Sequence, residues 1–177
     1  GNLLLHIGNT LLVYVLLRRM VPGIKGPLLG AVLFGVHPLH VETVAWVTES
    51  KGLLAAAFSL LAYLQFLTAT DSSGIKRQGS HFCAATLLFV LAMLSKPTAI
   101  SLPLIVAAVE FLLRRQTPSW LWAGLGAWVV LGGLMTMVTQ RVQSQSMLDV
   151  HSTGMLERIM IAGGALAFYF MKVIYPV

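Results

Sequence analysis

The sequence predicts an all-α protein, a polytopic bundle of about six to seven hydrophobic transmembrane helices. Hydrophobic residues make up 57% of the chain and charged residues 10%, and the mean hydropathy is +0.83. A water-soluble domain carries about 25% charged residues. The apolar residues also gather in seven stretches that are separated by short segments rich in proline, glycine and charge. These two observations favour a protein whose main partner is the lipid bilayer.

The net charge of +6 does not indicate a nucleic-acid partner. The basic residues are scattered over separate short loops, whereas a nucleic-acid surface needs them in one patch. Lys and Arg instead collect on the cytoplasmic side of membrane proteins. Cys83 is the only cysteine, so no internal disulfide forms.

The first predicted span covers residues 3–17 and is closed by Arg18 and Arg19. Asn2, His6 and Asn9 recur at positions i, i+4 and i+7, which places them on one face of the helix. A polar stripe in a membrane helix hydrogen-bonds to neighbouring helices or lines a ligand site. Both interpretations stay open from the sequence.

The second predicted span, residues 28–47, is interrupted. Its twenty residues would cover a hydrocarbon core of about 30 Å, but Pro38, two histidines and a glutamate fall within residues 37–42. Proline lacks the backbone N–H that the helix needs, so the helix should break near His37. A broken helix at membrane depth is tolerated where it lines a cavity. We therefore expect a functional site here.

The remaining predicted spans are residues 53–68, 82–94, 99–113, 120–138 and 159–173. Polar connections separate them, among them 48–52, 71–80 and 141–158. The last stretch crosses the membrane or lies in its interface, because Lys172 and Pro176 end it early.

Glu42 is the candidate catalytic carboxylate, since a carboxylate in a dry site can serve as a general base. If a helix restarts at Pro38, Glu42 shares a face with Trp46 and Glu49. The structural alternative is that Glu42 pairs with Lys51 or Lys96.

His37 and His40 are expected to position a substrate hydroxyl or phosphate. A metal is the weaker alternative, because Pro38 separates the two histidines and no His-Glu-x-x-His pattern is present. No metal site and no cofactor is therefore predicted.

Lys96, Lys51 and Arg141 are the candidate phosphate-binding residues. The simpler interpretation for each is that the side chain only extends to the membrane interface. Lys96 is the strongest candidate, because Pro97 restrains the turn beside it.

Alternating spans place seven basic residues on one side of the membrane and four on the other. The positive-inside rule then puts the loops with paired arginines in the cytoplasm. The segment 37–42, Lys96 and the 141–158 connection face the lumen of the endoplasmic reticulum or the bacterial periplasm.

Two segments carry a family resemblance. HPLHVETVAWV at 37–47, continued by KGLL at 51–54, and LSKPTAISLP at 94–103 resemble the membrane half of the transmembrane-and-tetratricopeptide-repeat protein O-mannosyltransferases and their bacterial relatives. Residues 2–19 and 169–176 are similar to further stretches of the same proteins. The resemblance covers most of the chain.

The resemblance implies the C-type glycosyltransferase (GT-C) architecture. It implies transfer of a sugar, mannose above all, from a polyprenyl- or dolichyl-phosphate carrier to Ser or Thr of a protein acceptor. In such enzymes a catalytic acid lies in the first external loop. We expect residues 1–177 to be one membrane domain of a longer protein, with that loop upstream and helical repeats downstream, and to be inactive alone. The rival hypothesis is a non-catalytic transporter or assembly scaffold whose His/Glu site moves ions or protons.

Overall fold

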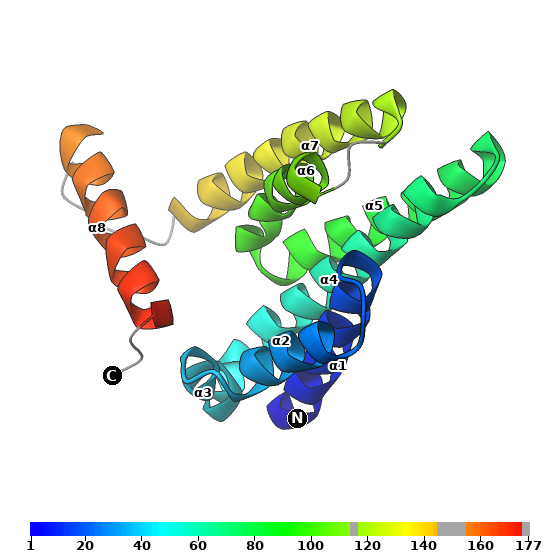
Figure 1. Ribbon diagram of the computed structural model, residues 1–177. Helices are drawn as coiled ribbons and strands as arrows, with labels where there is room; N and C mark the ends of the chain where they lie inside the picture. Colours follow the sequence, from blue (N-terminus) through cyan, green and yellow to red (C-terminus); the bar gives the residue numbers. More distant parts are fainter. Residues whose placement is uncertain (114–116, 145–154, 175–177) are drawn as a thin grey trace.

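The computed structural model describes residues 1–113, 117–144 and 155–174, and within these ranges the chain forms helices and no strand (Figure 1). The all-α bundle expected from composition is confirmed. In chain order the elements are α1 (Asn2–Met20), α2 (Lys25–Val36), α3 (Leu39–Ala45), the 3-10 helix η1 (Val47–Glu49), α4 (Ser50–Asp71), α5 (Ile75–Ser95), the 3-10 helix η2 (Pro97–Ser101), α6 (Leu102–Leu113), α7 (Ser119–Ser144) and α8 (Met155–Ile174).

Each of the seven apolar stretches is helical over most of its length, but the lengths of the helices differ. Four segments are long and apolar enough to cross a membrane: Asn2–Met20, Val47–Asp71, Ile75–Ser95 and Ser119–Arg141. A fifth is reached if α2 and α3 are one span with a bend of 58°. Pro97–Leu113 and Met160–Lys172 are shorter apolar helices.

The distribution of apolar side chains suits a lipid environment. Leu4 and Leu33 on α1 and α2 are exposed, whereas His6, Asn9 and Glu110 are buried. The exposed leucines are what differs from a soluble protein, which rarely exposes contiguous apolar surface of this kind. In lipid, polar groups must find partners inside the protein, so they turn inward.

The antiparallel pair α4–α5 forms the centre of the bundle. A short turn joins the two helices, and its Gly74 has a φ of 93°, a conformation that side-chain-bearing residues rarely adopt. The connection is therefore shorter than the predicted polar loop 71–80, because α5 begins at Ile75. α1 packs against α4 and carries α2 on its outer side, and α7 lies on the other side of the pair (Figure 1).

Aromatic rings hold α7 against α4 and α5. The fully buried Trp128 stacks on Phe89 with 4.9 Å between ring centroids and on Phe82 with 5.7 Å. Its indole N–H donates to Thr86 Oγ1 at 2.9 Å. Hydrophobic transfer contributes little to association between membrane helices, so ring packing and this hydrogen bond stabilise the contact.

The second span breaks where the sequence predicts. α2 ends at Val36, and His37 has an extended backbone with a ψ of 129°. The next helix is shorter than expected, however. α3 ends at Ala45, and Trp46 is again extended before η1. Glu49 therefore lies in a different element from Glu42, and the predicted shared face is wrong.

A glycine-to-valine exchange on α7 tests this packing. A Cβ atom at Gly124 would collide with the ring of Phe82, which lies between Trp120 and Trp128, whereas a Cβ at Gly126 meets nothing within 4 Å. We expect Gly124→Val to lower the free energy of unfolding by about 1–3 kcal/mol, the usual cost of overpacking. Gly126→Val carries the same change in helix propensity and is the control. Thermal unfolding in detergent, followed by tryptophan fluorescence, measures both. Equal melting temperatures for the two variants would contradict the α5–α7 contact.

Candidate functional site

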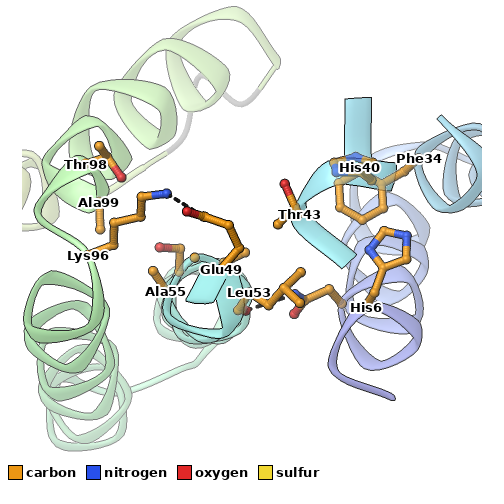
Figure 2. Close-up of a pocket in the computed structure, with 14 residues that line it drawn as sticks. His6, Phe34, His40, Thr43, Glu49, Leu53, Ala55, Lys96, Thr98 and Ala99 are labelled. Atoms are coloured by element: carbon orange, nitrogen blue, oxygen red, sulfur yellow. Dashed lines mark hydrogen bonds and ion pairs between the residues drawn. The ribbon is translucent and has the colours of Figure 1, made fainter. Parts of the chain in front are cut away.

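A cavity of about 340 Å³ opens at one end of the bundle, between the α2–α3 break and the α5–η2 connection (Figure 2). α1, α3 and the first turns of α4 form its walls, and the α5–η2 connection closes the side opposite α3. The cavity is lined by His6, Asn9, Phe34, His40, Thr43, Glu49, Gly52, Leu53, Ala55, Ala56, Ser59, Lys96, Thr98 and Ala99.

Polar side chains of α1 hydrogen-bond to backbone groups beside the breaks in the second span. In a continuous helix the N–H of Leu39 would bond to the carbonyl of Gly35, but it donates instead to His37 Nδ1 at 3.3 Å. The Gly35 carbonyl accepts a hydrogen bond from His6 Nε2 at 3.0 Å. A carbonyl is only an acceptor, so the Nε2 atom of His6 carries the proton. His6 thus satisfies a backbone group that the proline break exposes.

The other two residues of the stripe also donate to backbone carbonyl groups of neighbouring elements. Asn2 Nδ2 donates to the carbonyl of Trp46 at 2.7 Å, next to the second break. Asn9 Nδ2 donates to the carbonyl of Leu53 in α4 at 3.0 Å. The stripe therefore has the helix-linking role that its spacing suggested.

A carboxylate and a cation lie together in the cavity. Lys96 Nζ is 3.0 Å from Glu49 Oε2, and their side chains are 35% and 30% exposed. Gly52 makes room for the pair, because a Cβ there would lie 3.1 Å from Glu49 Oε2 and 3.4 Å from Lys96 Nζ. Lys96 is extended, with a φ of −154°, as expected of a residue before proline.

His40 separates this cavity from a second one. Its ring centroid is 5.1 Å from that of His6 and 4.5 Å from that of Phe34, and Figure 2 shows His40 and Phe34 side by side above His6. The second cavity, of about 380 Å³, is lined mainly by apolar side chains of α1, α2 and α3, with His6, His37 and His40. The two histidines His6 and His40 belong to both cavities.

The structure brings together only part of the predicted site. His40 and Lys96 line the first cavity, and His37 lines the second. Glu42 and Lys51 are exposed and line neither. Arg141 is exposed near the end of α7 and is also absent from both linings. The ion-pair partner of Lys96 is Glu49, not Glu42.

Sequence reasoning missed several residues of the cavity. Glu49 was noted only for its expected position beside Glu42, and the hydroxyl-bearing Thr43, Ser59 and Thr98 were not singled out. The 47-residue separation of Glu49 and Lys96 follows no short pattern that a sequence could reveal. His6 and Asn9 did carry a signal, the polar spacing on an apolar helix.

In the part of the chain that the structure describes, no group of three or more His, Cys, Asp or Glu side chains is arranged to hold a metal ion. The centroids of His37 and His40 are 6.3 Å apart. The arrangement can instead present one cation, one carboxylate and several hydroxyl groups to a polar ligand.

Basic residues lie at the other end of the bundle. Arg19 Nη1 donates to Thr68 Oγ1 at 2.7 Å, near the C-terminal end of α4, whereas Glu49 precedes its first turn. Lys76 and Arg77 lie in the first turn of α5, beside that same end of α4. Glu49 and Thr68, the partner of Arg19, are therefore about 28 Å apart along the axis of α4 at a rise of 1.5 Å per residue.

The fold and the cavity define a multi-pass membrane protein with a polar site at one end of its helix bundle. Among curated proteins, the chain is 32% identical over 111 residues to "Protein O-mannosyl-transferase Tmtc1" of Drosophila melanogaster, which covers 63% of this chain and 12% of that protein. It is 37% identical over 93 residues to "Protein O-mannosyl-transferase TMTC4" of Homo sapiens, covering 45% and 12%. It is 29% identical over 140 residues to "Protein O-mannosyl-transferase F38B6.6" of Caenorhabditis elegans, covering 77% and 19%.

These similarities confirm the resemblance found in the sequence: over part of its length the chain is similar to proteins named TMTC protein O-mannosyl-transferases. The matched part spans about an eighth of the length of the Drosophila and human relatives. No protein-family model and no solved structure matches the chain.

The Glu49–Lys96 pair can be tested for its contribution to folding. Lys96→Met leaves a half-buried carboxylate without its cation, and Glu49→Gln leaves the ammonium without its anion. Because both side chains are about one-third exposed, solvent screens the cost, and we expect each single variant to lose about 1–2 kcal/mol. The double variant should lose less than the sum, with a coupling of about 1 kcal/mol. Thermal unfolding of all four proteins in detergent measures this coupling, and strictly additive losses would show that the two side chains do not interact.

Proposed function

We propose that this protein is a membrane glycosyltransferase that moves a sugar, mannose in the first instance, from a polyprenyl- or dolichyl-phosphate carrier to Ser or Thr hydroxyls of proteins. The names of its relatives support an O-mannosyl transfer. The observation that carries the proposal for this chain is the cavity, in which Lys96 and Glu49 lie 3.0 Å apart beside hydroxyl-bearing side chains. A lipid-phosphate sugar requires a cation for its phosphate, a carboxylate for the acceptor proton and access from the membrane.

The proposal includes the GT-C architecture and an orientation. The cavity end of the bundle faces the lumen of the endoplasmic reticulum or the bacterial periplasm, and the end with Arg18, Arg19, Lys76 and Arg77 faces the cytoplasm. The positive-inside rule supports this orientation. So does the position of the basic residues at the opposite end of α4 from Glu49.

The proposed reaction uses the two charged groups of the cavity. The acceptor hydroxyl oxygen bonds to the anomeric carbon of the sugar, and the bond from that carbon to the phosphate oxygen breaks. The phosphate leaves with the bonding electrons, and the Lys96 ammonium balances its charge. The hydroxyl proton passes to a carboxylate, a role we give to Glu49 because it lines the cavity. His40, at the edge of the cavity, would orient the phosphate or the acceptor.

Glu42 stays a prediction from the sequence, and it can be separated from Glu49 by one experiment. The full-length protein in membranes is supplied with radiolabelled polyprenyl-phosphate-mannose, and label entering protein is followed for wild type, Glu49→Gln and Glu42→Gln. We expect Glu49→Gln to reduce the transfer rate by about 10²-fold or more, the usual contribution of a general base. Asp71→Asn removes a carboxylate from the far end of α4 and is the matched control.

The outcomes of this assay distinguish the hypotheses. Loss in Glu42→Gln alone would return the catalytic role to Glu42. Restoration of activity in Glu49→Asp would show that transfer requires a carboxylate at this position. Absence of transfer by wild type, with this donor and with other lipid-linked sugars, would reject the transferase and favour the transporter or scaffold.

A further inference from the structure

Two buried side chains on the α1 wall of the cavity each leave one hydrogen-bond acceptor unused. His6 and Asn9 are 6% and 1% exposed, and both line the cavity. The Nδ1 atom of His6 and the Oδ1 atom of Asn9 have no partner among the described residues. A buried polar atom without a partner is destabilising, so native structures retain such atoms only for a reason.

The chemistry of the unused atoms is fixed by the bonds that the same side chains already make. His6 donates its Nε2 proton to Gly35, which leaves a lone pair on Nδ1 in the neutral ring. Asn9 donates from Nδ2 to Leu53, which leaves its amide oxygen as an acceptor. The two residues are three positions apart on α1 and thus neighbours on one helix face. The α1 wall therefore carries two neighbouring side chains, each with one acceptor that has no partner among the described residues.

A pair of acceptors selects the kind of group that binds. Phosphate and carboxylate carry lone pairs of their own and would be repelled, while a hydroxyl group donates a proton. Two neighbouring hydroxyl groups on a sugar ring match two neighbouring acceptors. The ammonium of Lys96 lies on the other side of the cavity from His6, with Glu49 between them (Figure 2). The cavity thus has an anion-binding side and a hydroxyl-binding side.

We propose that His6 and Asn9 form a sugar-binding subsite, in which His6 Nδ1 and Asn9 Oδ1 accept hydrogen bonds from two hydroxyl groups of the donor's glycosyl unit. This inference rests on the proposed transferase function and deepens it, because it makes α1 the element that recognises the sugar. The phosphate of the donor then lies toward Lys96 and the sugar toward α1. The structural bonds of the two side chains hold the acceptors in place for the ligand.

Histidine-to-glutamine exchange separates the structural bond of His6 from its proposed contact with the sugar. In His6→Gln the side-chain amide nitrogen can replace Nε2 as the donor to Gly35, while the acceptor at the Nδ1 position is lost. The probes are a short-chain polyprenyl-phosphate-mannose and its monodeoxy analogues, each lacking one ring hydroxyl. Dissociation constants are measured with the full-length protein in lipid nanodiscs, and melting temperatures are recorded alongside.

We expect wild type to bind the parent donor about tenfold more tightly than the analogue lacking the matching hydroxyl, the equivalent of one hydrogen bond of about 1.4 kcal/mol. His6→Gln should keep its melting temperature, bind the parent donor about tenfold more weakly and no longer discriminate against that analogue. Asn9→Leu should lose discrimination at a different hydroxyl. Asn2→Ala is the control, because Asn2 makes the same kind of bond to a carbonyl but does not line the cavity.

Two results would overturn the subsite and one would overturn its basis. Unchanged discrimination in both His6→Gln and Asn9→Leu would mean that the acceptors hold only a structural water. Equal weakening of every analogue together with a lowered melting temperature, also in Asn2→Ala, would assign His6 a structural role alone. If wild type binds and transfers the donor in either case, the proposed function survives. If wild type binds no lipid-linked sugar, the proposed function fails and the subsite fails with it.

Discussion

The hydrogen bond from His6 Nε2 to the Gly35 carbonyl is the interaction on which the site depends. Pro38 breaks the second span, and every backbone group that the break frees must find a partner in the protein because lipid offers none. His6 supplies that partner from a different helix. Without it the bend of 58° between α2 and α3 would leave a bare carbonyl at membrane depth, a cost of several kcal/mol. The bend between α2 and α3, and the cavity beside it, therefore depend on the contact with α1.

The same constraint explains why the cavity lies at one end of the bundle. Both interruptions, at His37 and at Trp46, fall between α2 and α4, and a third extended residue, Lys96, joins α5 to η2. Regular helices pack their side chains closely, as the rings of Phe89 and Trp128 do farther along α5 and α7. Irregular backbone leaves space and brings charged side chains from distant segments together. The Glu49–Lys96 pair forms in that space.

The sequence predicted what depends on local patterns. The all-α fold, the break beside Pro38 and the polar face of α1 follow from hydrophobicity, from the missing proline N–H and from helical spacing. The site was predicted less well. Glu42 stood out because it lies in the conspicuous segment 37–42. The direction of the Glu49 side chain depends on the second break at the extended Trp46, and no local pattern indicates that break. The pairing of Glu49 with Lys96 depends on how α4 and α5 pack, and that is set by contacts far apart in the chain.

The charge balance of the cavity links the two parts of the proposed mechanism. A lone ammonium or carboxylate in a half-buried site is costly, so Lys96 and Glu49 neutralise each other while no ligand is bound. A phosphate that enters the cavity competes with the Glu49 carboxylate for the Lys96 ammonium, because the phosphate and the carboxylate are both anions. When Lys96 contacts the phosphate, the Glu49 carboxylate no longer has the ammonium as its only partner and is available to the acceptor hydroxyl. Under the proposed function, one lysine thus couples binding of the donor to release of the carboxylate that receives the proton.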